Sequence, residues 1–264
     1  MSADTSQSST AGSIDCSPII SPLETIERRG FSRHNLFRDW LELILSALQR
    51  DDDTYLSTLE KYNSDGSYKK GNRNADLFSK SFGELIRLTR ETNLDVLGDV
   101  YEEFGMSSSH FGQYFTPHPA AKMVAGVSVD ESHDSSPVSI ADPTCGSGRL
   151  LVYAARNIDE EVWAFGQDLD EMCARMAAIN FTLFNLNGII IQGDSLKLTK
   201  HRAWQTTHSK MGGGIREIDP KQCSVHENAL RDAKENSQRE DSAQHDENSS
   251  VTDLSNQTDI STWT

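Results

Sequence analysis

The chain has 264 residues, of which 36% are hydrophobic, so it is long enough for one large or two small domains with a packed core. Its 25 Lys and Arg residues face 40 Asp and Glu residues, which gives a formal net charge of −15. This acidity argues at first sight against a DNA partner, because phosphates attract basic side chains. No apolar run is long enough to cross a bilayer, so we expect no membrane association.

The local charge balance differs from the overall one. Residues 69–90 hold six basic and two acidic residues, and residues 194–217 hold five basic and two acidic residues. We expect phosphate contacts in these two stretches, although a solvated helix face explains the first equally well. The overall acidity alternatively fits a salt-rich cytoplasm, where acidic surfaces keep proteins soluble.

The cysteines and histidines indicate no metal or disulfide site. The four cysteines, at positions 16, 145, 173 and 223, form no Cys-x-x-Cys pair. A reducing, cytoplasmic setting is therefore expected. Three histidines of the central region also lack metal-ligand spacing: His110, His118 and His133.

The two ends of the chain are poor in core-like sequence. Residues 1–30 are predicted to be a disordered leader, since the first 17 are rich in Ser and Thr and have neither a basic start nor an apolar stretch. Residues 219–264 hold ten acidic and four basic residues and few large apolar ones, which predicts an acidic disordered tail.

Between these ends, the periodicity changes from helical to mixed. Apolar residues at helical spacing predict a helix over residues 31–50, with Ser32 as its candidate cap. Further helices are expected over residues 51–62, 74–89 and 94–104, so residues 31–105 are predicted to form a small helical domain. Residues 106–218 are predicted to form an α/β domain. Its expected strands end near residues 142, 168 and 192, with helices over 149–159 and 170–186 and one more short strand within 211–218.

The sequence DPTCGSGRLL at residues 142–151 is the most informative local pattern. The apolar Val138 and Ile140 lead into it, Gly146 and Gly148 allow a tight turn, and helical patterning follows. A helix N-terminus aimed at such a turn favours an anionic group. By itself the pattern is ambiguous, because Gly-x-Gly follows a strand in many α/β proteins that bind no nucleotide.

Acidic residues follow the next two expected strands. Asp168 lies twenty residues after Gly148, at the place where a ribose hydroxyl pair is usually held, and Asp194 with Ser195 follows the third strand. Ligands bind at the carboxyl ends of the strands in open α/β sheets. Each aspartate also has a purely structural alternative as a helix cap or turn residue.

The turn itself narrows the type of cofactor. A dinucleotide-binding loop has a third glycine at the position that Leu151 occupies here, so NAD and FAD are disfavoured. A Gly-Lys-Ser or Gly-Lys-Thr phosphate loop is absent as well. A cofactor with ribose and adenine but no phosphate remains.

Three motifs in a fixed order resemble those of N6-adenine DNA methyltransferases, especially the modification subunits of type I restriction systems. They are DVLGDVYEEF at residues 95–104, FGQYFTP at 111–117 and DPTCGSG at 142–148, and the resemblance extends to about residue 196. It implies an S-adenosylmethionine-dependent, Rossmann-like α/β domain, here with only three confident strands and therefore shortened. It also implies methyl transfer to adenine N6 in DNA within a restriction-modification system.

The resemblance also implies roles for individual residues. Asp142, Cys145 and the turn from Gly146 to Gly148 are expected beside the methionine end of S-adenosylmethionine. The residues expected to close over this end are Phe115, Thr116 and Pro117. Asp168 is expected to bind the ribose hydroxyls, and Asp194 the adenine amino group with Ser195 alongside. As a nucleophile Cys145 has no neighbouring His in sequence, so small buried packing is the preferred interpretation.

The catalytic tetrapeptide of the resembled family is not present. It consists of Asn or Asp, two prolines and an aromatic residue, and holds the flipped base. The chain has seven prolines, none of them adjacent. Trp204 as a base-stacking residue and Asn180 as a polar contact are both better interpreted as structural. The catalytic residues therefore stay unassigned.

Two alternative functions follow. Without the catalytic tetrapeptide, the chain is either an inactive S-adenosylmethionine-binding regulator or one half of a split methyltransferase. The expected partners are DNA and a specificity subunit or a complementary methyltransferase fragment.

Overall fold

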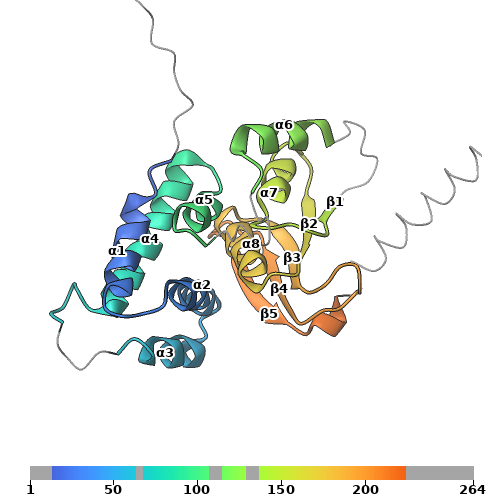
Figure 1. Cartoon of the computed structure of the whole chain (residues 1–264). Helices are drawn as coiled ribbons and strands as arrows, with labels where there is room; N and C mark the ends of the chain where they lie inside the picture. Colours follow the sequence, from blue (N-terminus) through green and yellow to red (C-terminus); the bar gives the residue numbers. More distant parts are fainter. Residues whose placement is uncertain (1–13, 64–67, 107–114, 129–136, 224–264) are drawn as a thin grey trace, which may run out of the picture. The chain divides into compact units, whose positions relative to one another are not determined.

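The computed structural model describes residues 14–63, 68–106, 115–128 and 137–223. Along these ranges the chain forms, in order, α1 (Ser17–Glu27), α2 (Arg33–Gln49), α3 (Asp52–Glu60), α4 (Asn74–Thr92), α5 (Val96–Glu103), α6 (His118–Ser128), β1 (Val138–Asp142), α7 (Arg149–Ala155), β2 (Val162–Asp168), α8 (Glu171–Leu183), β3 (Asn187–Gln192), β4 (Arg202–Thr207), β5 (Gly214–Ile218) and the 3-10 turn η1 (Pro220–Gln222) (Figure 1). His110, His133, residues 111–114 and the expected tail from residue 224 onward lie outside the described residues.

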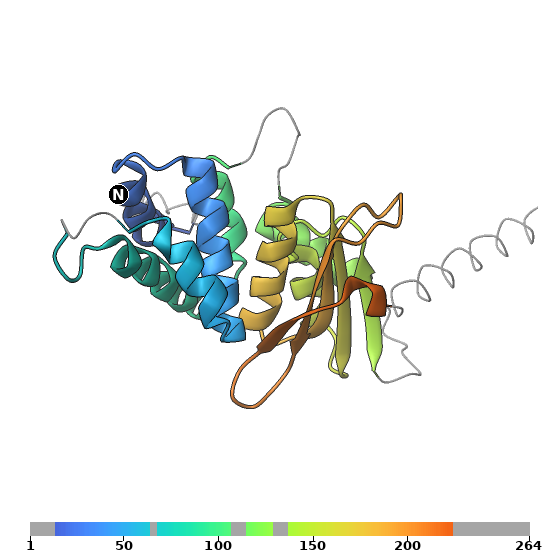
Figure 2. The ribbon, with the colours of Figure 1, turned by 90° about the horizontal axis from the view of Figure 1, so that it is seen from below.

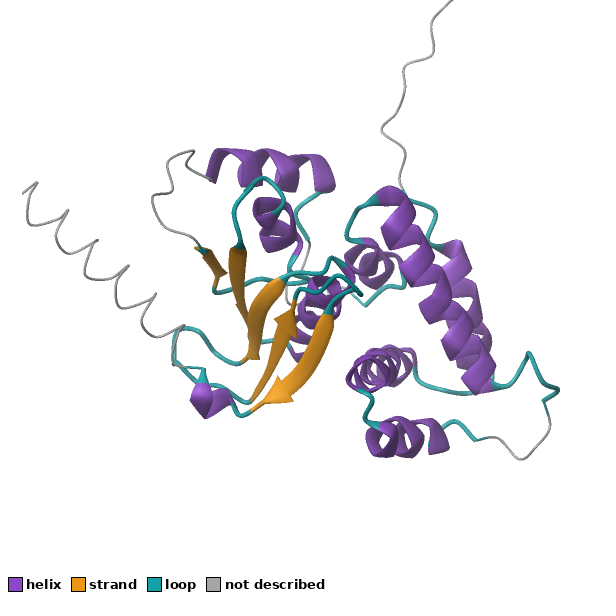
Figure 3. Cartoon of the chain, turned by 180° about the vertical axis from the view of Figure 1, so that it is seen from behind, coloured by secondary structure: helices purple, strands orange, loops and turns teal. Residues whose placement is uncertain are grey.

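The five strands form one mixed sheet in the order β1-β2-β3-β4-β5 (Figure 3). β1, β2 and β3 are parallel, with Asp142 opposite Gly166 and Asp168 opposite Gln192. β4 and β5 extend the sheet with antiparallel pairing. Because parallel strands share their direction, the carboxyl ends of β1, β2 and β3 meet at one edge of the sheet.

The predicted α/β fold class and its strands are confirmed, and one strand was not predicted. The three expected strands are β1, β2 and β3, and the short strand expected within residues 211–218 is β5. β4 escaped prediction because its sequence, RAWQTT, has only two apolar residues in succession. It forms a strand because β3 and β5 satisfy its backbone hydrogen bonds on both sides, and this pairing outweighs local propensity.

Helix α8 lies between α2 and the sheet (Figure 2). Eleven of its residues, Met172 to Thr182, are buried in succession, so the helix has no solvent-facing stripe and needs partners all round. Its start is fixed by Asp170, whose side chain accepts hydrogen bonds from the amides of Met172 at 2.8 Å and Cys173 at 3.0 Å. Such a cap contributes about 1 kcal/mol to helix stability.

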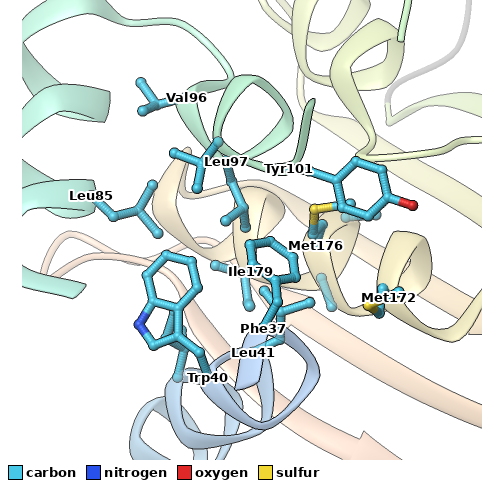
Figure 4. Packing of buried hydrophobic residues seen from close by; sticks show 14 of the residues in the cluster. Phe37, Trp40, Leu41, Leu85, Val96, Leu97, Tyr101, Met172, Met176 and Ile179 are labelled. Carbon is cyan, nitrogen blue, oxygen red and sulfur yellow. The ribbon is translucent and has the colours of Figure 1, made fainter. Parts of the chain in front are cut away.

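One hydrophobic cluster joins the helices to the sheet. In Figure 4 the side chains of α2, α5 and α8 pack together, and these include Phe37, Trp40, Leu41, Leu97, Tyr101, Met172, Met176 and Ile179. Burying a large apolar side chain stabilises the fold by about 1.5–3 kcal/mol. The described residues up to Pro220 belong to one compact unit. The division into a helical domain over residues 31–105 and an α/β domain over residues 106–218 stays a prediction.

The predicted helices agree with the structure, and two helices were missed. The expected helices over 31–50, 51–62, 74–89, 94–104, 149–159 and 170–186 correspond to α2, α3, α4, α5, α7 and α8. The unpredicted helices are α1 and α6. No helix among the described residues has the length and apolar character needed to span a membrane.

Helix α1 corrects the expectation that residues 1–30 form a disordered leader. Ile19, Leu23 and Ile26 are fully buried, at the four- and three-residue spacing of one helix face. This face packs against α4. The prediction treated the Ser- and Thr-rich composition of the first 17 residues as if it continued to residue 30. Pro18 does not oppose a helix here, because it stands at the start of α1, where proline is favoured.

The burial of α1 gives a test of this correction. We expect Leu23→Ala to lower the free energy of unfolding by about 2–5 kcal/mol, since it leaves a cavity against α4. Arg28→Ala, which removes an exposed side chain of the same segment, should change it by less than about 0.5 kcal/mol. Urea unfolding followed by circular dichroism measures both. Equal, small effects would show that α1 does not contribute to the core.

Candidate functional site

The glycine turn joins the end of β1 to the start of α7. Asp142 accepts a hydrogen bond from the amide of Thr144 at 2.9 Å, and the amide of Cys145 donates to the carbonyl of Gln167 on β2 at 2.9 Å. Gly146 and Gly148 have φ angles of +54° and +78°, which favour glycine. The sequence prediction of a tight turn between strand and helix is therefore confirmed.

The Phe115 ring lies against this turn. A Cβ atom added to Gly146 would stand 2.8 Å from Phe115 Cε1, closer than side chains tolerate. The Phe115 ring also packs against Tyr101 of α5, with ring centroids 5.4 Å apart. Gly146 therefore serves both the backbone turn and the close approach of an aromatic ring.

Asp168, at the end of β2, is tied to the turn by its carboxylate. Its Oδ2 accepts a hydrogen bond from the amide of Gly146 at 2.8 Å, and its Oδ1 accepts one from the amide of Asp170 at 2.9 Å. Burial raises the pKa of Asp168, and the two amide bonds oppose that shift only in part. A carboxylate has about four lone-pair positions, so others remain for a ligand that donates hydrogen bonds.

A cavity of about 190 Å³ lies at this edge of the sheet. Six of the predicted site residues line it: Phe115, Thr116, Asp142, Cys145, Gly146 and Asp168. Ser147, inside the predicted turn from Gly146 to Gly148, lines it as well. Four further lining residues were not predicted: Thr144, Arg149, Leu150 and Cys173. Three of these four fall within the glycine motif at residues 142–151, so its sequence would have been a sufficient signal for them. Cys173 comes from α8 and had no such signal.

Four predicted residues do not line the cavity: Pro117, Gly148, Asp194 and Ser195. Gly148 instead faces α8, where an added Cβ would stand 3.2 Å from the Cβ of Ala177. Asp194 accepts hydrogen bonds from the amides of Leu196 and Lys197, both at 3.0 Å. These bonds, that of Lys197 foremost, lower the pKa of Asp194. The structural alternative of a turn residue is thus realised for Asp194.

The residue that caps α8 is Asp170 and not Asp168, because the side chain of Asp170 accepts the capping hydrogen bonds. The carboxylate of Asp168 remains directed to the turn and the cavity.

Beneath the cavity lies a buried polar cluster that sequence reasoning did not identify as part of the site. Its centre is Asp95, which is fully buried. The Arg149 Nε donates to Asp95 Oδ2 at 2.9 Å, the Ser147 hydroxyl donates to the same oxygen at 2.5 Å, and Asn180 Nδ2 donates to Asp95 Oδ1 at 2.7 Å. Arg149 also donates to Asp99 Oδ1 at 2.6 Å. These partners are 50 to 85 residues apart, too distant for local patterns to reveal.

Three structural interpretations from the sequence hold in this geometry. Trp204 is fully buried in β4 and so has no face for a nucleic-acid base. Asn180 is a buried member of the cluster around Asp95. Cys145 is 6% exposed, and burial together with the charges of Asp168 and Asp142 raises its pKa well above the ordinary value, which opposes a role as nucleophile.

Within the described ranges, no group of three or more His, Cys, Asp or Glu side chains is arranged to hold a metal ion.

Residues 92–213 match the family model described as N-6 DNA Methylase. This segment is similar to the N-6 DNA methylase family. Its range contains α5, the glycine turn and all residues that line the cavity. The three motifs, the parallel strands and the cavity thus lie within the matched residues.

Two curated methylase subunits are similar to part of the chain. The type I restriction enzyme MjaVII methylase subunit of Methanocaldococcus jannaschii is 29% identical over 133 residues, which cover 44% of this chain and 22% of that protein. The MjaVIII methylase subunit of the same organism is 31% identical over 115 residues, which cover 40% of this chain and 19% of that protein. The matched part of the chain therefore spans about a fifth of the length of these relatives.

A solved structure is also similar to the chain. It is the methyltransferase subunit of a type I restriction-modification system from Streptococcus thermophilus, which is 24% identical. The similarity covers 64% of this chain and 36% of that one, with a TM-score of 0.33.

The burial of the thiols makes their reactivity a measurable property of the site. Burial raises the pKa of Cys16 to about 12 and the pKa of Cys173 further, so few thiolates exist near neutral pH. We expect Cys16, Cys145 and Cys173 of the folded protein to react with a disulfide reagent at pH 8 roughly a thousandfold more slowly than after unfolding. Mass spectrometry identifies the labelled positions. Rapid labelling of Cys145 in the folded protein would support a reactive thiol instead.

Proposed function

We propose that this N-6 DNA methylase segment binds S-adenosylmethionine and serves the transfer of its methyl group to adenine N6 in DNA, as part of a restriction-modification methyltransferase. The observation that carries the proposal is the carboxylate of Asp168. It stands at the end of β2, bonded to the Gly146 amide, and faces the cavity beside Phe115. Carboxylates at this position of open α/β sheets accept hydrogen bonds from ribose hydroxyls.

The residues around the cavity suit the proposed cofactor. S-adenosylmethionine supplies a methyl group on a positively charged sulfur, and the cavity carries the carboxylates of Asp142 and Asp168 beside an aromatic ring. The volume of about 190 Å³ is below the ~300–1,000 Å³ typical of whole ligand pockets, so it suits part of the cofactor. We assign the methionine and ribose portions to it.

The proposed cofactor contacts are those expected from the sequence. Phe115, Thr116 and Pro117 lie against the methionine portion, together with Asp142, Cys145, Gly146 and Gly148. Asp168 accepts from the ribose. Asp194 and Ser195 contact the adenine outside the cavity. The carboxylate of Asp194 stands at the end of β3, where it already accepts hydrogen bonds from the amides of Leu196 and Lys197.

The proposed partners are DNA and a specificity subunit or a complementary methyltransferase fragment, in the cytoplasm. Basic residues in the 69–90 and 194–217 stretches are the proposed phosphate contacts. Arg73, Arg87 and Arg202 already form ion pairs with neighbouring carboxylates, so contact with phosphate would exchange one anionic partner for another.

Titration calorimetry with S-adenosylmethionine tests the proposal. We expect binding by the 264-residue chain and a loss of affinity of about 10- to 100-fold in Asp168→Ala, because a charge-assisted hydrogen bond contributes ~1.5–3 kcal/mol. Asp159→Ala, which removes an exposed carboxylate away from the cavity, is the matched control and should bind like wild type. The proposal fails if wild type does not bind or if Asp168→Ala binds equally well.

Tritiated methyl transfer to unmodified DNA then separates the proposed activity from its alternatives. Transfer by this chain supports the proposed reaction directly. Binding without transfer favours an inactive regulator or one half of a split enzyme, and addition of the complementary fragment distinguishes these two.

The raised pKa of Asp168 predicts a pH dependence of binding. The carboxylate accepts hydrogen bonds best when ionised, and its pKa lies above the ordinary value because of burial. We therefore expect the affinity for S-adenosylmethionine to fall as the pH is lowered through this raised pKa, by up to tenfold per pH unit. Asp168→Asn, which does not titrate, should lose this dependence. An unchanged pH profile in Asp168→Asn would assign the effect to another group.

A further inference from the structure

Residues 115–118, which carry Phe115 past the glycine turn, are anchored at three successive points. The amide of Phe115 donates to Glu102 Oε1 at 2.8 Å, and the carbonyl of Thr116 accepts from Arg149 Nη1 at 2.9 Å. The Nε2 atom of His118 lies 2.8 Å from Asp99 Oδ2, and its Nδ1 atom lies 2.5 Å from the hydroxyl of Tyr153. All anchoring side chains come from α5 and α7, so these two helices fix the path of the segment.

Arg149 connects these anchors. Its side chain is 4% exposed, and the three guanidinium nitrogens donate to four acceptors: Asp95 Oδ2, the Asp95 carbonyl, Asp99 Oδ1 and the Thr116 carbonyl. It also lies 5.8 Å from the centroid of the Phe115 ring. A guanidinium is planar and donates in fixed directions, so bonds to Asp95 and Asp99 determine where its remaining donor points.

The glycine at position 98 fits the same arrangement. A Cβ atom there would stand 2.4 Å from Asp95 Oδ2 and 2.8 Å from Arg149 Nη2. Glycine in a helix interior costs about 0.5–1 kcal/mol relative to alanine. The absence of a side chain at Gly98 therefore makes room for the buried ion pair between Asp95, which caps α5, and Arg149 of α7.

We propose that Arg149 is a positioning residue, which, oriented by Asp95 and Asp99, holds the 115–118 segment so that the Phe115 ring covers the cofactor at the glycine turn. The identity of the cofactor in this inference rests on the proposed function. The anchoring of the 115–118 segment by Arg149 rests on the hydrogen bonds alone. Arg149 acts through Thr116 and Phe115, and the two aspartates satisfy its charge. A residue already neutralised in this way is less suited to bind the carboxylate of the cofactor directly.

The test uses a charge-balanced variant, because removing Arg149 alone would leave the Asp95 charge buried without a partner. Asp95→Asn with Arg149→Met removes the anchor and leaves the net charge of the cluster unchanged. The matched control is Glu42→Gln with Arg175→Met, which removes another buried ion pair, 2.5 Å long, whose members do not line the cavity. Gly98→Ala is a second test variant, which disturbs the pair without altering a charged residue.

Hydrogen exchange measured by mass spectrometry on the cofactor-free protein gives the first result. We expect peptides within residues 115–128 to exchange faster in Asp95→Asn/Arg149→Met and in Gly98→Ala, and to be unchanged in the control. If the double variant does not fold, Gly98→Ala provides the comparison. Unchanged exchange in these peptides overturns the inference whether or not the protein binds S-adenosylmethionine.

Affinity for S-adenosylmethionine gives the second result, through a double-mutant cycle with Phe115→Ala. We expect the Asp95→Asn/Arg149→Met pair and Phe115→Ala each to weaken binding by about 10- to 100-fold, and their combination to be no weaker than Phe115→Ala alone. Multiplicative losses would mean that Arg149 contacts the cofactor itself, and would overturn the positioning role. Wild-type protein that fails to bind contradicts the proposed function, while the exchange result still decides the anchoring.

Discussion

The buried carboxylate of Asp95 is the interaction on which the rest of the site depends. It caps α5 through the amide of Gly98 and accepts from Ser147 in the glycine turn, from Arg149 at the start of α7 and from Asn180 in α8. A buried charge without partners costs several kcal/mol, and an ion pair offsets this only with good geometry and further hydrogen bonds. These contacts join four elements at one point. A buried ion pair adds little net stability by itself, so these contacts stabilise the site only because every acceptor position of Asp95 is used in this geometry.

The two ends of this cluster serve different parts of the cavity. Ser147 and Asn180 fix the glycine turn, and Asn180 also donates to the Ser147 carbonyl at 2.8 Å. Arg149 fixes the 115–118 segment above it. The helical N-terminal part is therefore a structural component of the cavity, because α5 provides Asp95, Asp99, Glu102 and Tyr101. The residues that match the family model, 92–213, include α5 as well as the sheet.

Sequence reasoning reached the parts of the site whose determinants are local. Gly146 and Asp168 lie within one strand-turn-helix-strand unit, and parallel pairing of β1 with β2 brings them together. The Asp95–Arg149 pair joins residues 54 positions apart, and no periodicity marks it. The same reason explains β4, whose strand character depends on two neighbours in the sheet. Helix α1 was missed for a different reason, since its spacing of apolar residues was visible but the leader was judged by composition.

The buried charge of Asp168 lowers the stability of the fold, but the same charge favours the proposed binding. Asp168 is held by two amides, yet burial still raises its pKa, so its ionised form is under-solvated in the protein alone. An acid with a raised folded-state pKa lowers the stability of the fold as the pH rises from its unfolded-state pKa through its folded-state pKa, and the full cost remains at higher pH. Hydroxyl donors or a positive charge in the cavity would solvate the same carboxylate. A cofactor with a diol and a cationic sulfur would therefore offset the free-energy cost of burying the ionised Asp168 carboxylate. This is the chemistry proposed for the site.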